Sequence, residues 1–138
     1  MIIAIRISGM PEVSNTVQET LFRLRLRRKY SAVLLSNTKE NANLLRQVRD
    51  FIAYGTLENA DIVKLIQKRA ISTDKKKIDA VKITELINTK GIKSVPIKPF
   101  FRLHPPRGGI DSKIHFPIKK GVLGDHGNKI NELLVRML

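Results

Sequence analysis

The segment Ile2-Ile3-Ala4-Ile5-Arg6-Ile7-Ser8 is dense in β-branched residues, which favour extended backbone over helix. It predicts a strand, and its nearly continuous apolar character places that strand at the centre of a sheet. Gly9 and Pro11 interrupt the apolar run. We therefore expect a buried strand to which the following elements are added.

A helix and a second strand are predicted next. Apolar residues recur at helical spacing up to about Leu26. Thr16 stands three residues before a glutamate, the spacing of a capping box, although Ser14 is an alternative cap. The apolar residues 32–35 then predict a short strand.

The same alternation continues to residue 55. Polar residues at 36–38 supply the start of a second helix, and 51–54 predict a third strand that Gly55 closes. Residues 1–55 therefore predict a βαβαβ core of the α+β class, with a three-stranded sheet and a ferredoxin-like character. Both helices should cover one face of the sheet, which leaves the other face for a partner or for the C-terminal half.

The 138 residues are expected to form a single domain with two additions to this core. Residues 56–99 predict a helical insertion with short helices at 59–69 and 79–89. Residues 100–138 predict a basic loop extension that ends in a helix capped by Asn128.

Composition excludes several kinds of chemistry. The chain has no cysteine, so disulfides, thiolate catalysis and cysteine-based metal sites are ruled out. No apolar run approaches the roughly 20 residues that a membrane-spanning helix needs. The apolar N-terminal residues read as a strand rather than as a signal peptide.

The net charge of +14 is the strongest global signal. A small domain with so much positive charge repels itself and usually has a polyanion as its partner. Nucleic acid is the first expectation, and a membrane surface, which would require the cations on one face of an amphipathic helix, is the second.

Two segments concentrate the positive charge. Residues 23–29, at the end of the first predicted helix, hold five cations and no acid, more than a helix dipole needs. Residues 90–120 hold eight lysines and arginines against the single acid Asp111, a net charge of +7. The second segment is too basic to form a core of its own, so we expect it to wrap across the folded part.

The segment 100–110, Phe-Phe-Arg-Leu-His-Pro-Pro-Arg-Gly-Gly-Ile, combines an extended start with a stiff turn. Alternation in its first part puts Arg102 and His104 on one face. Gly108 and Gly109 can adopt positive φ and permit close approach of the backbone to a partner. The turn either presents cations and backbone N–H groups to phosphates or is an ordinary surface turn.

No catalytic constellation is recognisable. His104, His115 and His126 are eleven residues apart, which is not a compact metal-ligand spacing, and the acids are scattered. The glycines at 121, 124 and 127 lack the lysine of a phosphate-binding nucleotide loop and are expected to shape a turn before the last helix. We expect no enzyme activity, cofactor, metal or small-molecule substrate; histidine-dependent phosphoryl chemistry is a remote alternative.

The sequence argues against two common modes of nucleic-acid binding. The first strand carries no aromatic residue for a single-strand stacking platform, and no recognition helix follows a tight turn. Contacts from arginine and lysine to phosphates remain, with a rigid loop fitted to folded RNA. A DNA-compacting or other non-ribosomal nucleic-acid-binding protein is the alternative.

Several motifs together resemble one family. They are Phe101-Arg102-Leu103-His104-Pro105-Pro106-Arg107-Gly108-Gly109, then Gly121-x-Leu123-Gly124, a closing Ile130-Asn131-Glu132-Leu133, and Val48-Arg49-Asp50-Phe51-Ile52-Ala53-Tyr54-Gly55 in the front half. They resemble the archaeal large-ribosomal-subunit protein L-thirty, whose eukaryotic counterpart is L-seven, over nearly the whole chain.

The resemblance implies an antiparallel sheet in the βαβαβ core and a non-catalytic, cytoplasmic role in the ribosome. The implied partners are ribosomal RNA of the large subunit and neighbouring ribosomal proteins, without a membrane. The residues expected to contact the RNA are Arg23, Arg25, Arg27, Arg28, Lys29, Arg102, His104, Arg107, Gly108, Gly109, Lys113, Lys119 and Lys120.

Overall fold

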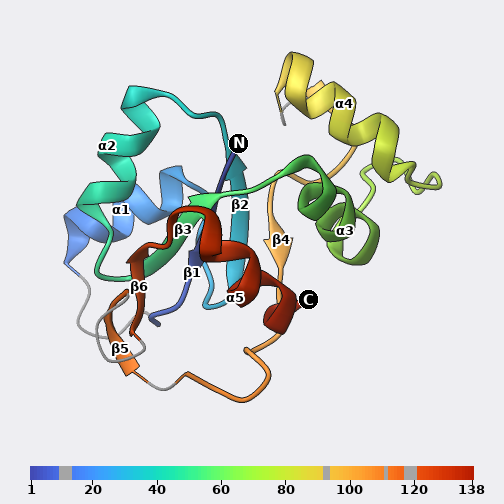
Figure 1. Cartoon of the computed structure of the whole chain (residues 1–138). Coiled ribbons are helices and arrows are strands. Elements are labelled where there is room, and N and C mark those ends of the chain that lie inside the picture. Colours follow the sequence, from blue (N-terminus) through green and yellow to red (C-terminus); the bar gives the residue numbers. More distant parts are fainter. Residues whose placement is uncertain (10–13, 92–93, 111, 117–120) are drawn as a thin grey trace.

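The structure is a computed structural model that describes residues 1–9, 14–91, 94–110, 112–116 and 121–138 (Figure 1). It has a mixed α+β fold around a six-stranded sheet of order β4-β2-β1-β3-β6-β5. The elements are β1 (Ile2–Arg6), α1 (Asn15–Arg23), β2 (Ser31–Leu35), α2 (Lys39–Gln47), β3 (Ile52–Thr56), α3 (Asn59–Arg69), α4 (Ala80–Lys90), β4 (Phe101–Arg102), β5 (Ser112–His115), β6 (Gly121–Asp125), the 3-10 turn η3 (Gly127–Lys129) and α5 (Ile130–Met137).

The first strand lies inside the sheet, as predicted. β1 pairs antiparallel with β2 on one side and with β3 on the other, so that Ala4 lies between Val33 and Tyr54. The sheet is larger than the predicted three strands. β4 pairs with β2 at one edge, and β6 and then β5 extend the other edge beyond β3 in parallel.

Alternate residues of β1 supply two separate cores. Ile2 and Ala4 pack with buried leucines of α1 and α2 on one face of the sheet. Ile3 and Ile5 pack on the opposite face with apolar residues of α3, α4 and α5. In Figure 1, α1 and α2 accordingly lie together, apart from α3 and α4. The C-terminal half therefore covers the face that the sequence left unassigned.

Side-chain caps fix several helix starts. Ser14, rather than Thr16, caps α1 by accepting from the backbone N–H of Val17, and Thr38 caps α2 in the same way. The prediction that Asn128 caps the last helix is wrong. Asn128 lies within η3, and α5 begins at Ile130 after this tighter turn.

The expectation that the glycines at 121, 124 and 127 shape the turn before the last helix holds for Gly127, which begins η3, and is wrong for the other two. Gly121 and Gly124 belong to β6, where parallel pairing with β3 buries Val122 and Leu123. Gly55 likewise lies inside β3 rather than at its end. A Cβ there would stand 2.3 Å from the carbonyl oxygen of Gly127, so β3 and η3 can only meet this closely at a glycine.

Candidate nucleic-acid interface

The first basic segment begins in a tight turn that ends α1. The N–H of Leu26 donates to the carbonyl of Leu21 at 2.9 Å, and that of Arg25 donates to Phe22 at 3.0 Å. These bonds form a Schellman motif, and both leucines are fully buried as its hydrophobic contact. The left-handed position that usually holds glycine holds Arg25, with φ 63°. The helix therefore stops before Leu26 and turns its arginines outward.

A buried arginine stabilises this turn through hydrogen bonds to backbone carbonyls. Arg6 has no exposed surface, and its guanidinium donates to the carbonyl oxygens of Leu26 at 2.7 Å and Ser8 at 3.0 Å. Burial lowers the pKa of Arg6, because desolvation disfavours its charged form. Arg6 thus connects the end of β1 to the turn that carries the exposed cations.

The segment then returns to the sheet through a second residue with positive φ. Tyr30 has φ 63°, donates its N–H to the carbonyl of Arg6 at 2.7 Å, and accepts from the N–H of Leu103 at 3.0 Å. Leu24 and Leu26 are buried between exposed cations. All five predicted cations of this segment are exposed: Arg23, Arg25, Arg27, Arg28 and Lys29.

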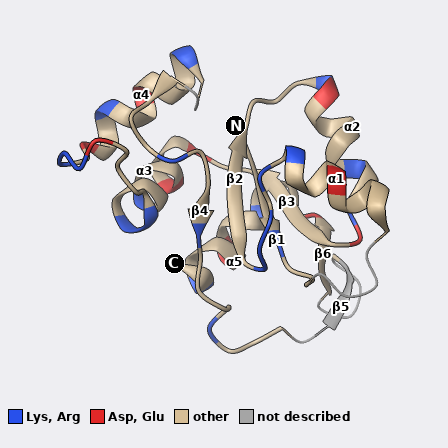
Figure 2. Cartoon of the chain, turned by 180° about the vertical axis from the view of Figure 1, so that it is seen from behind, with Lys and Arg blue, Asp and Glu red and all other residues tan. Residues whose placement is uncertain are grey.

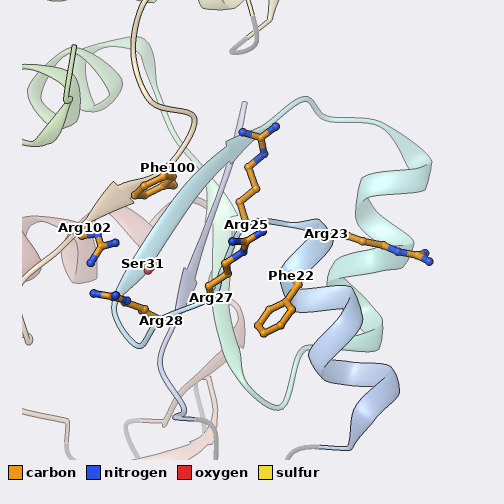
Figure 3. A pocket seen from close by; sticks show the side chains of 8 residues that line it. All are labelled: Phe22, Arg23, Arg25, Arg27, Arg28, Ser31, Phe100 and Arg102. Carbon is orange, nitrogen blue, oxygen red and sulfur yellow. The ribbon is translucent and has the colours of Figure 1, made fainter. Parts of the chain in front are cut away.

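Four of these arginines meet Arg102 of β4 around an open depression of about 480 Å³. Its lining comprises Phe22, Arg23, Arg25, Arg27, Arg28, Ser31, Phe100 and Arg102. Figure 3 shows the guanidinium groups of Arg28 and Arg102 near Ser31, whereas that of Arg23 extends toward α2. The fold therefore brings together arginines of two basic segments, of which Arg28 and Arg102 are 74 residues apart in the sequence. We call this site the arginine depression.

Two arginines of the arginine depression rest on aromatic rings. The guanidinium carbon of Arg27 lies 5.7 Å from the ring centre of Phe22, and that of Arg102 lies 5.6 Å from the ring centre of Phe100. Such cation–π contacts hold the cations in place without neutralising them. Within the described ranges, no ion pair involves an arginine of the depression. Its charge is therefore available to an anion.

The alternation predicted after Phe100 is confirmed. Phe101 and Leu103 are buried, whereas Arg102 and His104 are exposed. Phe101 is paired with Ala32 in the sheet, so this part of the basic extension belongs to the fold rather than wrapping over it.

The proline-glycine turn is fastened to the last helix. Arg136 of α5 donates from Nε to the carbonyl of Arg107 at 2.9 Å and from a terminal nitrogen to the carbonyl of Gly109. The N–H of Arg107 donates back to the carbonyl of Arg136 at 3.0 Å. Gly108 and Gly109 have φ of 79° and 76°, as their type predicts. The exposed side chain of Arg107 thus projects from a braced loop.

The remaining predicted residues lie elsewhere. Lys113 is in β5, at the edge of the sheet opposite to β4, and Lys119 and Lys120 lie outside the described residues. Lys29 does not line the arginine depression; its Nζ lies 5.1 Å from the ring centre of Tyr30. Figure 2 shows blue over most of the segment between α1 and β2, and also on other elements. The predicted cations are thus distributed over several surfaces.

The described histidines do not form a common site. His126 is buried, stacks on Phe116 with ring centres 4.3 Å apart, and lies 2.6 Å from the carbonyl of Val122 through Nε2. Burial is the main cause that lowers the pKa of His126. His104 is exposed. Among the described residues no three potential metal ligands cluster, and no helix is long and apolar enough to cross a membrane.

Sequence reasoning missed the residues that shape the site. Phe22 carried a usable signal, since a large apolar residue lies off the buried stripe of α1 and beside an arginine. Arg6 also carried one, as the single charge in a buried strand. The contact of Arg136 with its partner loop gave no signal, because that loop lies 27 to 29 residues away.

The fold and the site define a small, strongly basic α+β protein with an exposed arginine depression at one sheet edge. No protein-family model matches the chain. It is 33% identical to large ribosomal subunit protein uL30 of Archaeoglobus fulgidus, over 99% of each chain. It is 36% identical to the protein of that name from Ignicoccus hospitalis, over 97% of this chain and 95% of the other, and 33% identical to that from Methanococcus maripaludis, over 97% of each.

The chain belongs to the uL30 family of large ribosomal subunit proteins. The family that the sequence motifs resemble is thereby confirmed.

Proposed function

We propose that the protein is a structural constituent of the large ribosomal subunit that binds ribosomal RNA. The observation that carries the proposal is the arginine depression, which five arginines line and in which none is neutralised by a described acid. Such a surface binds phosphates by releasing counterions, which provides affinity and position rather than sequence readout. The names of the similar proteins support the ribosomal setting.

The other predicted contacts form part of the same proposal. The braced loop would add Arg107 and His104 beside backbone that Gly108 and Gly109 leave bare, and Lys29 would extend the first segment. Lys113 would reach RNA from another side, because β5 lies at the far edge of the sheet. Lys119 and Lys120, which lie outside the described residues, are proposed as further contacts. The RNA would therefore contact the protein on more than one surface.

The same proposal covers the wider setting of the molecule. The chain would act in the cytoplasm as part of the ribosome, beside other ribosomal proteins and without catalysis. Residues 1–55 would be a ferredoxin-like core within a single domain of 138 residues, since apolar residues of both halves share one buried cluster across the sheet.

Sedimentation tests the proposal. The tagged chain would replace uL30 in Methanococcus maripaludis, and lysates would be separated on gradients at rising salt. We expect the tag to travel with large subunits, and RNase but not DNase to release it. A variant with Arg27, Arg28 and Arg102 changed to Gln should leave the particle at lower salt. A tag that stays at the top of the gradient or that DNase releases would contradict the proposal.

A further inference from the structure

We infer that the arginine depression holds one nucleotide turned out of the RNA stack, with its base against a phenylalanine ring and its phosphates at the arginines. This inference rests on the proposed function and names the feature of the RNA that this site would take. Its starting observation is that the lining combines cations with two aromatic rings. Cations alone suffice to bind backbone phosphates, whereas aromatic rings in the same hollow can also contact a base.

The first argument is the placement of the rings. Phe22 is 38% exposed although it lies on a helix whose apolar stripe is otherwise buried, and Phe100 is half-buried at the start of β4. Each ring has an arginine over one face at cation–π distance, so a base would stack on the other face of the ring or on the arginine plane. An unstacked base binds through stacking on an aromatic face, and arginine planes contribute to the same stack. The two pairs therefore offer what a base and its phosphate need together.

The second argument is the shape of the site. A volume of about 480 Å³ lies within the range of roughly 300–1,000 Å³ typical of sites for small organic ligands. A duplex backbone lying across a flat basic surface would need no such hollow. Ser31, at the start of β2, adds a hydroxyl to the lining, which can donate to or accept from a base edge or a ribose.

The third argument is rigidity. The segment that carries Arg25, Arg27 and Arg28 begins and ends in tight turns at residues with positive φ. A hydrogen bond from Arg6 to the carbonyl of Leu26 ties the segment to β1. Phe101, next to Phe100, is fully buried and paired in the sheet. A preformed hollow loses little conformational entropy on binding, which suits recognition of a single unpaired nucleotide within a folded RNA.

Two model RNAs test the inference directly. One is a hairpin with a single bulged nucleotide, and the other is the same hairpin fully paired. The full chain should bind the bulged hairpin more tightly. Changing Phe22 or Phe100 to Leu, which keeps an apolar side chain but removes the π face, should weaken binding of the bulged hairpin roughly 5-fold or more. The salt slope should not change, because no charge is lost.

Matched variants complete the design. Leu86→Ala removes an apolar side chain on α4 with the same 38% exposure, away from the depression, and should leave both affinities unchanged. Arg102→Gln should lower the log–log salt slope by about 0.9 for both hairpins, since a duplex-like phosphate contact is lost. Thermal unfolding of each variant verifies that the fold is retained.

The outcomes separate the two proposals. If the Phe variants bind the bulged hairpin as the unchanged protein does, the nucleotide site is overturned, whatever the sedimentation result. If the phenylalanines matter for the bulged hairpin but the chain does not travel with large subunits, the nucleotide site stands and the ribosomal assignment fails. Equal affinity of the unchanged protein for the two hairpins also overturns the inference.

Discussion

Arg25 occupies a backbone conformation that costs free energy for any residue with a Cβ. At the left-handed position of a Schellman motif, glycine is the residue that avoids this cost. Arginine at this place gives up some stability and gains a cation on the rim of the arginine depression. The two effects can be separated by substitution.

Arg25→Gly should raise the free energy of unfolding of the RNA-free protein by about 1 kcal/mol, because the left-handed strain disappears. The same variant should weaken RNA binding and lower the log–log salt slope by about 0.9 for a duplex-like site. Urea denaturation and salt-dependent binding measure the two quantities. Arg25→Ala is the control: it loses the charge but keeps the strain, so it should match the binding loss without the gain in stability. Destabilisation by Arg25→Gly would refute the assignment of strain.

His126 should make folding stability depend on pH. Its pKa in the folded protein is lowered, chiefly by burial, so the unfolded chain takes up the proton first as the pH falls. The free energy of unfolding should therefore fall below about pH 6.5, the ordinary pKa of histidine, by at most about 1.4 kcal/mol per pH unit. His126→Gln should flatten this dependence in urea titrations between pH 7.5 and 5.5. A pH dependence that stays unchanged in this variant would contradict the prediction.

Among the secondary-structure elements, the close packing of β3 against η3 depends on the absence of a Cβ atom at Gly55. Gly55→Ala would place a methyl group 2.3 Å from the carbonyl oxygen of Gly127 and 2.8 Å from Cβ of Ile130. We expect a loss of about 1–3 kcal/mol in the free energy of unfolding, since the backbone must shift. Gly109→Ala meets no atom within 4 Å and should cost less, from its φ alone. Urea denaturation of both variants checks this order, and a larger cost at Gly109 would be evidence against it.

Elements with a clear local period were predictable. Periodicity identified β1, α3 and the buried stripe of α5, because each is defined by side chains close together in the sequence. β6 escaped prediction because it contains two glycines and shows no apolar alternation of useful length. β4 has two residues, and the sequence predicted its extended, alternating backbone but not its pairing in the sheet. Their pairing partners lie about 70 residues away, a distance over which periodicity gives no information.

The candidate site was likewise predictable only in part. The sequence identified its cations by type and number, since charge is visible without a fold. It did not show that Arg28 and Arg102 line one hollow, because that requires the pairing of β4 with β2. Nor did it show that Phe22 and Phe100 share this hollow. Composition thus predicted a basic surface, and topology decided which of its cations lie together.

For the whole molecule, the charge of +14 should produce opposite salt dependences. Added NaCl screens the repulsion among the cations, so the melting temperature of the RNA-free protein should rise between 0.05 and 0.5 M. RNA binding should weaken over the same range, because the release of counterions into a more concentrated salt solution gains less entropy. Thermal unfolding and binding titrations measure the two trends. Changing Arg27 and Arg28 to Gln should reduce both, and a melting temperature that falls with NaCl would contradict the prediction.

The contact of Arg136 with the loop at 107–109 also has a consequence for the order of synthesis. While a chain is being made, residues 100–110 are complete before the helix that fastens them exists. The braced form of the loop becomes available only once residue 136 has been added and has emerged. A chain stalled before that point would carry the arginine-rich turn after α1 together with an unfastened loop at 107–109. The shape of the loop is thereby coupled to the synthesis of α5.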